Sequence, residues 1–558
     1  MQKKFFNLDY LTPILLGLAS VTYIGGYSFY YLNSANIDWF VSGVSNSDLE
    51  THWLGWSFYR NAPFFQFPLL LNPNYGLGLN ISLVHTDSIP LMSFLFKPFT
   101  SILPQNFQYF GIWILLSTFL QSIFAYKTMK IFSKDVFICS VTTLFFLFAP
   151  IFYMRIFAQP AIGSQWLLIA ALYLYLSPNT NYRRWFILSF FALMINGYLF
   201  AMVFGIYIAF VIKELMEKNI NFTKFSLLIF GKIFFSLLLM WIVGYFSVGT
   251  GIQEGGFGFY KMNLNSFFDP MALYELHSRI IPDLPSPSVE DFGDYEGFAF
   301  LGIGVLVCIL IALLSLVKSK IKFKTTSVAP LILISLVFIV FAISNKISLG
   351  NSILFEYKVP NLLDDITSTF RSSARFIWPV YYLIYIAVFA VLIKKFNLIK
   401  LRVFLTLVFL LQVYDTSLAT DLIRLRMTNF DQHWGRAEKW SSPIVSIKWP
   451  AIARKYDKIF YVVPENKPDK YFPIAKFASE NKMATNFGYF SRRSLKKEEQ
   501  IINNLRQSVL KLNFNPTAIY IFNDDELWEF ALKNKNEFDL LDEIDGYRVL
   551  APNYYFID

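Results

Sequence analysis

Long apolar runs recur through the first 420 residues of this chain, and they constrain its fold more than any other feature. The 558 residues are 55% hydrophobic and only 16% charged, whereas a soluble globular chain carries about 25% charged residues. A helix that crosses a bilayer needs about 20 consecutive apolar residues, with about 17 as the lower limit. The sequence therefore predicts a mainly α-helical polytopic membrane protein.

Clusters of lysine and arginine between the apolar runs predict how the chain crosses the membrane, because such clusters gather in cytoplasmic loops. The clusters lie at 3–4, 127–134, 183–184, 213–224, 318–324 and 394–402. About eleven spans, among them segments near 135–153, 160–177 and 297–317, place every cluster on one side, with the N-terminus in the cytoplasm and the C-terminus outside. The same rule keeps residues 91–104 out of the membrane core, as a helix that lies flat at the interface.

One apolar run is too long for a single straight span. Residues 185–213 have basic residues at both ends, so the run must cross an even number of times. We expect two short helices that meet at Asn196-Gly197-Tyr198, in a place where they face protein or a cavity rather than lipid.

Composition divides the chain into two predicted domains. Residues 1–420 form the membrane domain, whose outer loops are expected at 33–106, 249–296 and 346–375. From residue 421 charge rises, and KIFYVVP (458–464) and AIYIFND (518–524) are typical of strands that alternate with helices. This pattern predicts an α/β domain over 421–558, outside the cytoplasm and therefore in the periplasm of a bacterium.

The first outer loop carries acids and histidines among aromatic residues. Asp48 and His52 are four residues apart and would share one face of a helix, where the carboxylate could act as a general base or bind a divalent cation such as Mg²⁺ or Mn²⁺. Alternatively, Asp48 is only the N-cap of that helix. The same two readings apply to Asp87, which precedes Pro90 at the start of the next helix. The further substrate-binding candidates in this loop are Glu50, Trp56, Arg60 and His85.

Arginines at the predicted outer face suggest a phosphate site. Arg371 and Arg375 are four residues apart, and two guanidinium groups on one helix face match phosphate oxygens. Arg155 lies at the tip of a predicted outer hairpin. Glu296 lies at the outer end of a predicted span, and an acid at such a position is a candidate functional residue. The alternative is that the arginines anchor the spans at the interface. The glycine-rich stretch EGGFGFY has no lysine or strand–helix setting of a phosphate loop, so we expect a mobile loop there.

Several sequence blocks resemble one known family. HWLGWSFYR, NPNYG, TDSIPL, GFGFYKMNL, YEGFAFLG and FRSSARFIWPVYYL are similar to blocks of an uncharacterised bacterial family of multi-pass proteins that is grouped with GT-C glycosyltransferases. The resemblance covers nearly the whole membrane part. It implies a GT-C-like fold, a polyprenyl-phosphate sugar donor and a carboxylate near the start of the first outer loop, which corresponds to Asp48.

The resemblance also adds two site residues and a function. Tyr295 belongs to the block that contains Glu296, and Gln159 stands where the family pattern leads us to expect a histidine. The implied function is an inverting transfer of sugar from a lipid-phosphate donor to a glycan or lipid acceptor, as in O-antigen modification, at the outer side of the bacterial inner membrane. No nucleic acid is expected as a partner. The alternative is a non-enzymatic flippase or export partner for lipid-linked glycans, which should show charged or broken helices mid-membrane.

Overall fold

The computed structural model describes residues 8–42, 47–178, 180–249, 256–273, 275–287, 292–317 and 324–555. Most of the basic cluster at 318–324 and the glycine-rich start of the second predicted outer loop lie outside the described residues. The chain is mostly helical and divides into two compact units. Unit 1 comprises Met1–Asn33, Tyr109–Ser236 and Glu254–His433, and unit 2 comprises Ser34–Gln108, Leu237–Gln253 and Trp434–Asp558.

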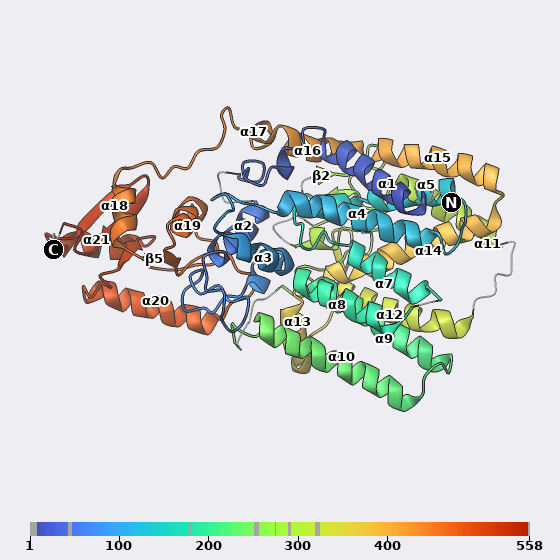
Figure 1. The fold of residues 1–558 in the computed structure, drawn as a ribbon, viewed down its shortest axis with the longest axis horizontal. Helices are drawn as coiled ribbons and strands as arrows, with labels where there is room; N and C mark the ends of the chain where they lie inside the picture. Colours follow the sequence, from blue (N-terminus) through green and yellow to red (C-terminus); the bar gives the residue numbers. More distant parts are fainter. Residues whose placement is uncertain are drawn as a thin grey trace, which may run out of the picture. The chain divides into compact units, whose positions relative to one another are not determined.

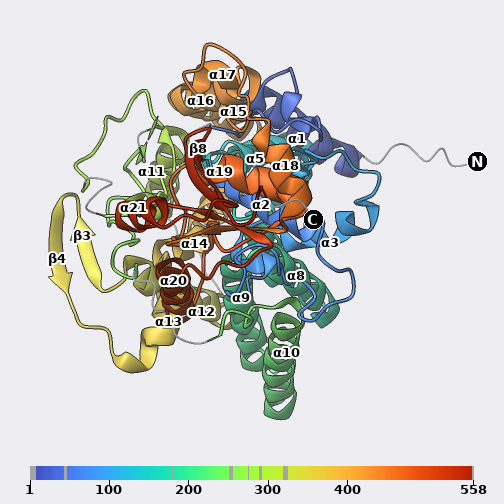
Figure 2. The same cartoon turned by 90° about the vertical axis from the view of Figure 1, so that its left-hand side faces the viewer.

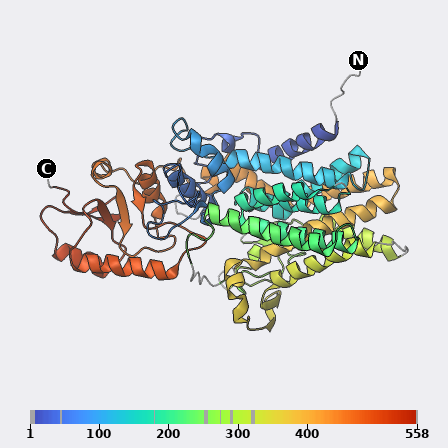
Figure 3. The same ribbon diagram turned by 60° about the horizontal axis from the view of Figure 1, so that its bottom comes forward.

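Unit 1 is built from apolar helices that run side by side (Figures 1 and 3). Its main helices are α1 (Leu8–Gly25), α4 (Phe110–Met129), α5 (Val136–Leu147), α6 (Pro150–Ile156), α7 (Trp166–Leu176), α8 (Tyr182–Ile195), α9 (Gly197–Met216), α11 (Ile303–Val317), α12 (Thr325–Ile343), α14 (Trp378–Lys395), α15 (Leu398–Asp415), α16 (Ser417–Thr428) and α17 (Phe430–His433). Helix α10 (Phe222–Val243) continues from unit 1 into unit 2.

Fewer helices than predicted are long enough to cross a membrane. In the described residues five helices qualify by length and composition, namely α4, α9, α10, α12 and the continuous segment Ser373–Lys395. A sixth span results if α5 and α6, which are bent by 56° relative to each other, count as one. The prediction of about eleven spans is therefore not supported.

The physical reason is that an apolar run need not be helical over its whole length. The predicted span 160–177 is helical only from Trp166 to Leu176, and the predicted span 297–317 only from Ile303 onward. Two residues separate the end of α5 from Pro150, which begins a new helix and so divides the predicted span 135–153. In each case residues that are apolar enough for lipid form turns or short helices.

The predicted break at Asn196 is confirmed. Helix α8 ends at Ile195 and α9 begins at Gly197. Asn196 is extended between them, and its side-chain oxygen accepts a hydrogen bond from Tyr198 N at 2.9 Å, which caps the second helix. The second helix is longer than we expected, at 20 residues.

The C-terminal part of unit 2 is a small α/β structure, as predicted. Strands β5 (Lys458–Tyr461), β6 (Ala484–Thr485), β7 (Ala518–Ile521), β8 (Leu540–Ile544) and β9 (Tyr547–Ala551) form one sheet in the order β6-β5-β7-β9-β8. Strand β5 is parallel to β6 and β7, whereas β9 is antiparallel to β7 and β8. The helices around it are α18 (Lys448–Lys455), α19 (Tyr471–Glu480), α20 (Leu495–Leu510) and α21 (Asp525–Lys533).

The first predicted outer loop belongs to the same compact unit as this sheet. Thr485 N, at the sheet edge, donates to Asn74 O at 2.9 Å, and Leu77 N donates to Thr485 O at 2.7 Å. Helix α2 (Asp48–Tyr59) packs against α19, where the hydroxyl groups of Ser57 and Ser479 lie 2.8 Å apart. The contacts thus divide the chain differently from the predicted boundary at residue 420.

The segment predicted to lie flat at the interface forms two short helical turns, α3 (Pro90–Phe96) and the 3₁₀ turn Lys97–Phe99. Neither is long enough to cross a bilayer. Leu95, Phe99 and Ile102 expose apolar side chains, which suits an interfacial position. That position itself stays a prediction.

Candidate functional site

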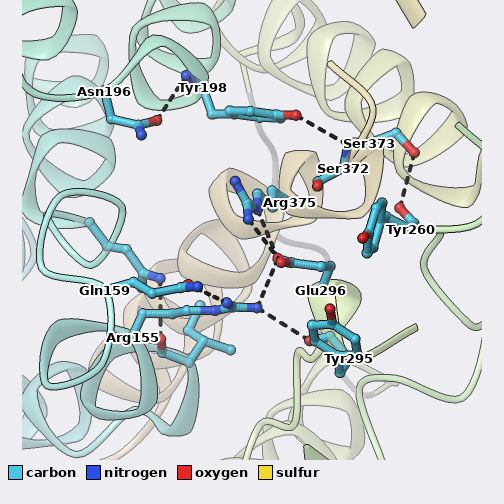
Figure 4. Close-up of polar contacts among 12 residues, drawn as sticks. Arg155, Gln159, Asn196, Tyr198, Tyr260, Tyr295, Glu296, Ser372, Ser373 and Arg375 are labelled. Atoms are coloured by element: carbon cyan, nitrogen blue, oxygen red, sulfur yellow. Dashed lines mark hydrogen bonds and ion pairs between the residues drawn. The ribbon is translucent and has the colours of Figure 1, made fainter. Parts of the chain in front are cut away.

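A buried carboxylate in unit 1 binds two arginines. Glu296 lies in the 3₁₀ turn Asp294–Gly297, Arg155 in α6, and Arg375 in the 3₁₀ turn Ser373–Ile377. Arg375 donates from Nε to Oε2 and from Nη2 to Oε1, both at 2.8 Å, and Arg155 Nη2 donates to Oε2 at 3.0 Å. The two guanidinium groups reach the carboxylate from different sides (Figure 4).

Two other predicted site residues hold Arg155 in place. Arg155 Nη1 donates to Gln159 Oε1 at 2.6 Å, and Nη2 also donates to the carbonyl oxygen of Tyr295 at 3.3 Å. Gln159 lies one helical turn after Arg155, and its N–H donates to Arg155 O at 2.7 Å. The structure therefore brings together five residues that the sequence nominated separately: Arg155, Gln159, Tyr295, Glu296 and Arg375. We call these five residues the arginine network.

Each arginine near Glu296 also lies over an aromatic ring. Arg155 lies 5.7 Å from the ring centroid of Trp378, and Arg375 lies 4.9 Å from that of Tyr198. Arg371 lies 5.8 Å from the ring centroid of Tyr260. Ring faces attract guanidinium groups, so these contacts restrict where the charges can lie.

These three aromatic residues were not among the predicted site residues. Tyr198 lies at the predicted helix break, and its hydroxyl accepts a hydrogen bond from Ser372 N at 3.1 Å. Trp378 and Tyr260 lie in sequence blocks that carried the family resemblance. Their position in those blocks was the available signal, but sequence alone did not pair a ring with an arginine.

Burial and the arginines act on Glu296 in opposite directions. Burial raises its pKa, whereas the charges of Arg155 and Arg375, the hydrogen bond from Arg375 and, least, the charge of Arg371 lower it. The arginines dominate and lower the pKa of Glu296 to about 2. Glu296 is therefore a carboxylate at neutral pH and has no proton to donate.

The predicted arginine pair differs from this geometry. Arg371 lies outside any helix or strand, before the 3₁₀ turn that begins at Ser373. The four-residue spacing to Arg375 therefore does not place both side chains on one face of an α-helix, and that prediction is wrong. The reason is that the apolar helix begins only at Trp378. Arg371 still acts on Glu296 through its charge.

In unit 2, the charges of both candidate bases act on one histidine. Burial lowers the pKa of His52, while the negative charges of Asp87 and Asp48 partly oppose that effect. Helix α2 comes close to the turn that carries Asp87, and a Cβ on Gly55 would lie 2.3 Å from Ser88 Oγ. The two acids, 39 residues apart in sequence, thus act on the same imidazole, whereas the sequence had paired His52 only with Asp48.

Capping does not account for these two acids. Ser47 is the N-cap of α2, and Asp48 is its first helical residue. The N-cap of α3 is Ile89, with no side-chain cap, and Pro90 is the first helical residue as predicted. Both acids had been given capping as an alternative role, and neither occupies the N-cap position.

The other candidates of this loop have structural hydrogen bonds. Glu50 Oε1 accepts from Ser42 N at 2.5 Å and from Ser42 Oγ at 2.9 Å, and Trp56 Nε1 donates to Phe107 O at 3.1 Å. His85 Nδ1 accepts from Ser82 N at 3.3 Å, and Nε2 lies 3.4 Å from Tyr245 O. Burial lowers the pKa of His85 to about 4, so the ring is neutral at pH 7.

Arg60 fastens the end of α2 to the chain that follows α3. Its guanidinium group donates to four carbonyl oxygens, those of Pro104 at 2.7 Å, Gln105 at 2.8 Å, Leu103 at 3.1 Å and Thr100 at 3.2 Å. This arrangement is that of a structural clamp. The guanidinium donors that we predicted to bind substrate are therefore used in these main-chain hydrogen bonds.

Metal ligands are not grouped in the described residues. No set of three or more His, Cys, Asp or Glu side chains there lies close enough together to hold a metal ion.

Fold and site together define a class of protein: a largely helical chain with several candidate membrane spans, an arginine network in its helical unit and a C-terminal sheet-containing domain. The chain belongs to the family described as a domain of unknown function, DUF6311, whose model matches residues 14–417. A second model, the DUF6311 C-terminal domain, matches residues 448–552. No curated protein matches the chain.

Proposed function

We propose that this chain is a glycosyltransferase of the bacterial inner membrane. It moves a sugar from a polyprenyl-phosphate donor to a cell-surface glycan or lipid-linked acceptor on the periplasmic side, where its C-terminal domain lies. The observation that carries the proposal is the arginine network, in which one buried carboxylate holds two guanidinium groups. Guanidinium forks match the oxygens of a phosphate group as well as those of a carboxylate.

The network supports phosphate binding because it is ordered in advance. Arg155 and Arg375 are held by Glu296 and by the rings of Trp378 and Tyr198, so little ordering remains for a ligand to impose. Donors fixed near a leaving phosphate stabilise the charge that develops on it. In this role Glu296 is a positioning residue, because it orients the arginines.

The proposed reaction is one displacement at the sugar. The acceptor oxygen forms a bond to the anomeric carbon, the bond from that carbon to the phosphate oxygen breaks, and polyprenyl phosphate leaves. The acceptor hydroxyl proton passes to a carboxylate base. The sequence nominates Asp48 or Asp87 for that base, and each nomination is tested separately.

The proposal is tested with polyprenyl phosphate, which is the product whatever the sugar. Purified protein in lipid nanodiscs should bind polyprenyl phosphate, detected by native mass spectrometry, and should not bind polyprenol, which lacks the phosphate. Incubation with polyprenyl-phosphate hexoses and an envelope extract should then release polyprenyl phosphate. Binding without release would favour the flippase or export partner, and absence of binding would contradict both.

A further inference from the structure

A short hairpin in unit 1 exposes an apolar strand. Strand β3 (Lys346–Leu349) pairs with β4 (Ser352–Glu356) in a two-stranded sheet. On the inner side Leu264 N donates to Ser348 O at 3.0 Å, and Asn263 exchanges hydrogen bonds with the main chain of Gly350. All five residues of β4 are exposed, with Leu354 57% and Phe355 59% accessible.

The exposure continues beyond the hairpin. Successive residues of a strand point to opposite faces, so Leu354 and Phe355 show that neither face of β4 is covered. In the following turn and α13 (Asp364–Thr369), Leu362 is 91% accessible and Ile366 is also exposed. Figure 2 shows β3 and β4 at the margin of the helices of unit 1. In water an apolar edge strand of this kind invites pairing with other chains.

The neighbouring elements indicate what covers this surface. The hairpin begins three residues after the end of α12 at Ile343, and the next candidate span begins at Ser373. The ring of Phe341 in α12 lies 4.8 Å from that of Phe376, so the end of one span lies beside the start of the next. The exposed apolar face of α12 extends to Val340, which is 65% accessible.

We infer that residues 346–366 lie on the membrane and insert Leu354, Phe355 and Leu362 into the surface of the bilayer. Among the described residues no strand pairs with the outer edge of β4, and this edge sets the depth, because unpaired main-chain groups are not tolerated in the hydrocarbon core. The strand therefore lies in the headgroup layer, with its apolar side chains toward the acyl chains. The lipid surface is the occupant, since the apolar face of α12 leads directly to the hairpin.

The inference also relates the position of Arg371 and Arg375 to the lipid headgroups. The chain continues from α13 to Arg371 and Arg375, so these two residues follow a segment that is held at headgroup level. Lipid phosphates lie at the same level. This inference rests on the membrane placement and not on sugar transfer, so it can fail while the proposed function holds, and the reverse.

Fluorescence in nanodiscs tests the position of the hairpin. The two native cysteines, Cys139 and Cys308, are buried, so a cysteine added at an exposed site can be labelled selectively with an environment-sensitive dye. Leu354→Cys and Leu362→Cys are the test variants. Leu333→Cys, at an exposed position of α12, serves as the deep control, and Asn534→Cys in the C-terminal domain serves as the aqueous control.

Lipids that carry a spin label either at the headgroup or deep in the acyl chain report the depth. We expect dyes at 354 and 362 to be quenched several-fold more by the headgroup label than the dye at 534. The dye at 333 should respond mainly to the deep label. Test dyes that behave like the aqueous control would overturn the inference. Blue-shifted emission without quenching by either lipid would also overturn it, because protein, such as a second copy of the chain, would then cover the hairpin.

Discussion

Arg375 binds Glu296 side-on, with Nε and Nη2 each donating to a different carboxylate oxygen at 2.8 Å. Arg155 donates to the same carboxylate at 3.0 Å. Removing one partner of a buried ion pair typically costs about 3–5 kcal/mol, because the other charge stays buried without compensation. Since two arginines share one carboxylate, a change at any of the three residues should affect the whole network.

The first prediction concerns the shape of the Arg375 side chain. Arg375→Lys keeps the positive charge but cannot donate side-on to both oxygens. We expect polyprenyl phosphate binding to weaken about 10-fold or more, corresponding to about 1.4 kcal/mol, the loss of one net charged hydrogen bond. Native mass spectrometry of the nanodisc protein measures the change. Arg183→Lys, at an exposed position in α8, is the control. Unchanged binding in Arg375→Lys would show that Arg375 does not recognise the phosphate.

The second prediction is a pH dependence of stability. The pKa of Glu296 is about 2 in the folded protein against an ordinary value of 4.5. As pH falls, the unfolded chain therefore takes up the proton first, and the stabilisation of about 3 kcal/mol present above pH 4.5 is lost progressively between about pH 4.5 and 2. Denaturant unfolding over this range measures the loss. Glu296→Gln should be less stable at neutral pH and should lack this part of the slope, whereas an identical slope in both proteins would contradict the prediction.

The third prediction separates the two candidate bases. Asp48→Asn and Asp87→Asn each preserve shape and remove the charge that can accept a proton. Substitution of the residue that acts as the base should lower the rate of polyprenyl phosphate release about 10²–10⁴-fold. That variant should still bind polyprenyl phosphate. His52 provides an independent readout: each substitution should lower its pKa further, because both charges raise it. Full activity in both variants would exclude both Asp48 and Asp87 as the base.

The fourth prediction concerns the clamp at Arg60. Lysine has a single donor group and cannot reach four carbonyl oxygens at once, so Arg60→Lys should lower the free energy of unfolding by about 1.5–3 kcal/mol. The matched control is again Arg183→Lys. Limited proteolysis should show earlier cleavage within 97–108 in the Arg60 variant. Equal protection of this segment in both variants would show that the clamp contributes little.

Sequence reasoning located the network residues but not their pairing. Local signals, such as an acid at the outer end of a predicted span, led us to predict Glu296, Arg155 and Arg375 as site residues. The ion pairs depend on three distant elements meeting, and apolar helices carry little information about which neighbour they face. The same limit applies to Arg60, whose four carbonyl partners lie about 40 residues away.

Span counting failed for a different reason. Hydropathy records how apolar a run is, whereas crossing a membrane also requires an unbroken helix. The break at Asn196 could be predicted, because asparagine and glycine occur together there between basic flanks. Hydropathy does not indicate the bend before Pro150, because apolar residues continue from α5 into the start of α6.

The contact between Ser57 and Ser479 joins residues 422 positions apart. During synthesis at about 5–20 residues per second, the ribosome needs roughly 20–80 s to add that length of chain. For all of this time α2 exists without α19, although Trp53 and Trp56 are fully buried in the finished protein. The first loop therefore leaves the ribosome long before the last part of the chain is synthesised. Its fold is completed only after that last part is present.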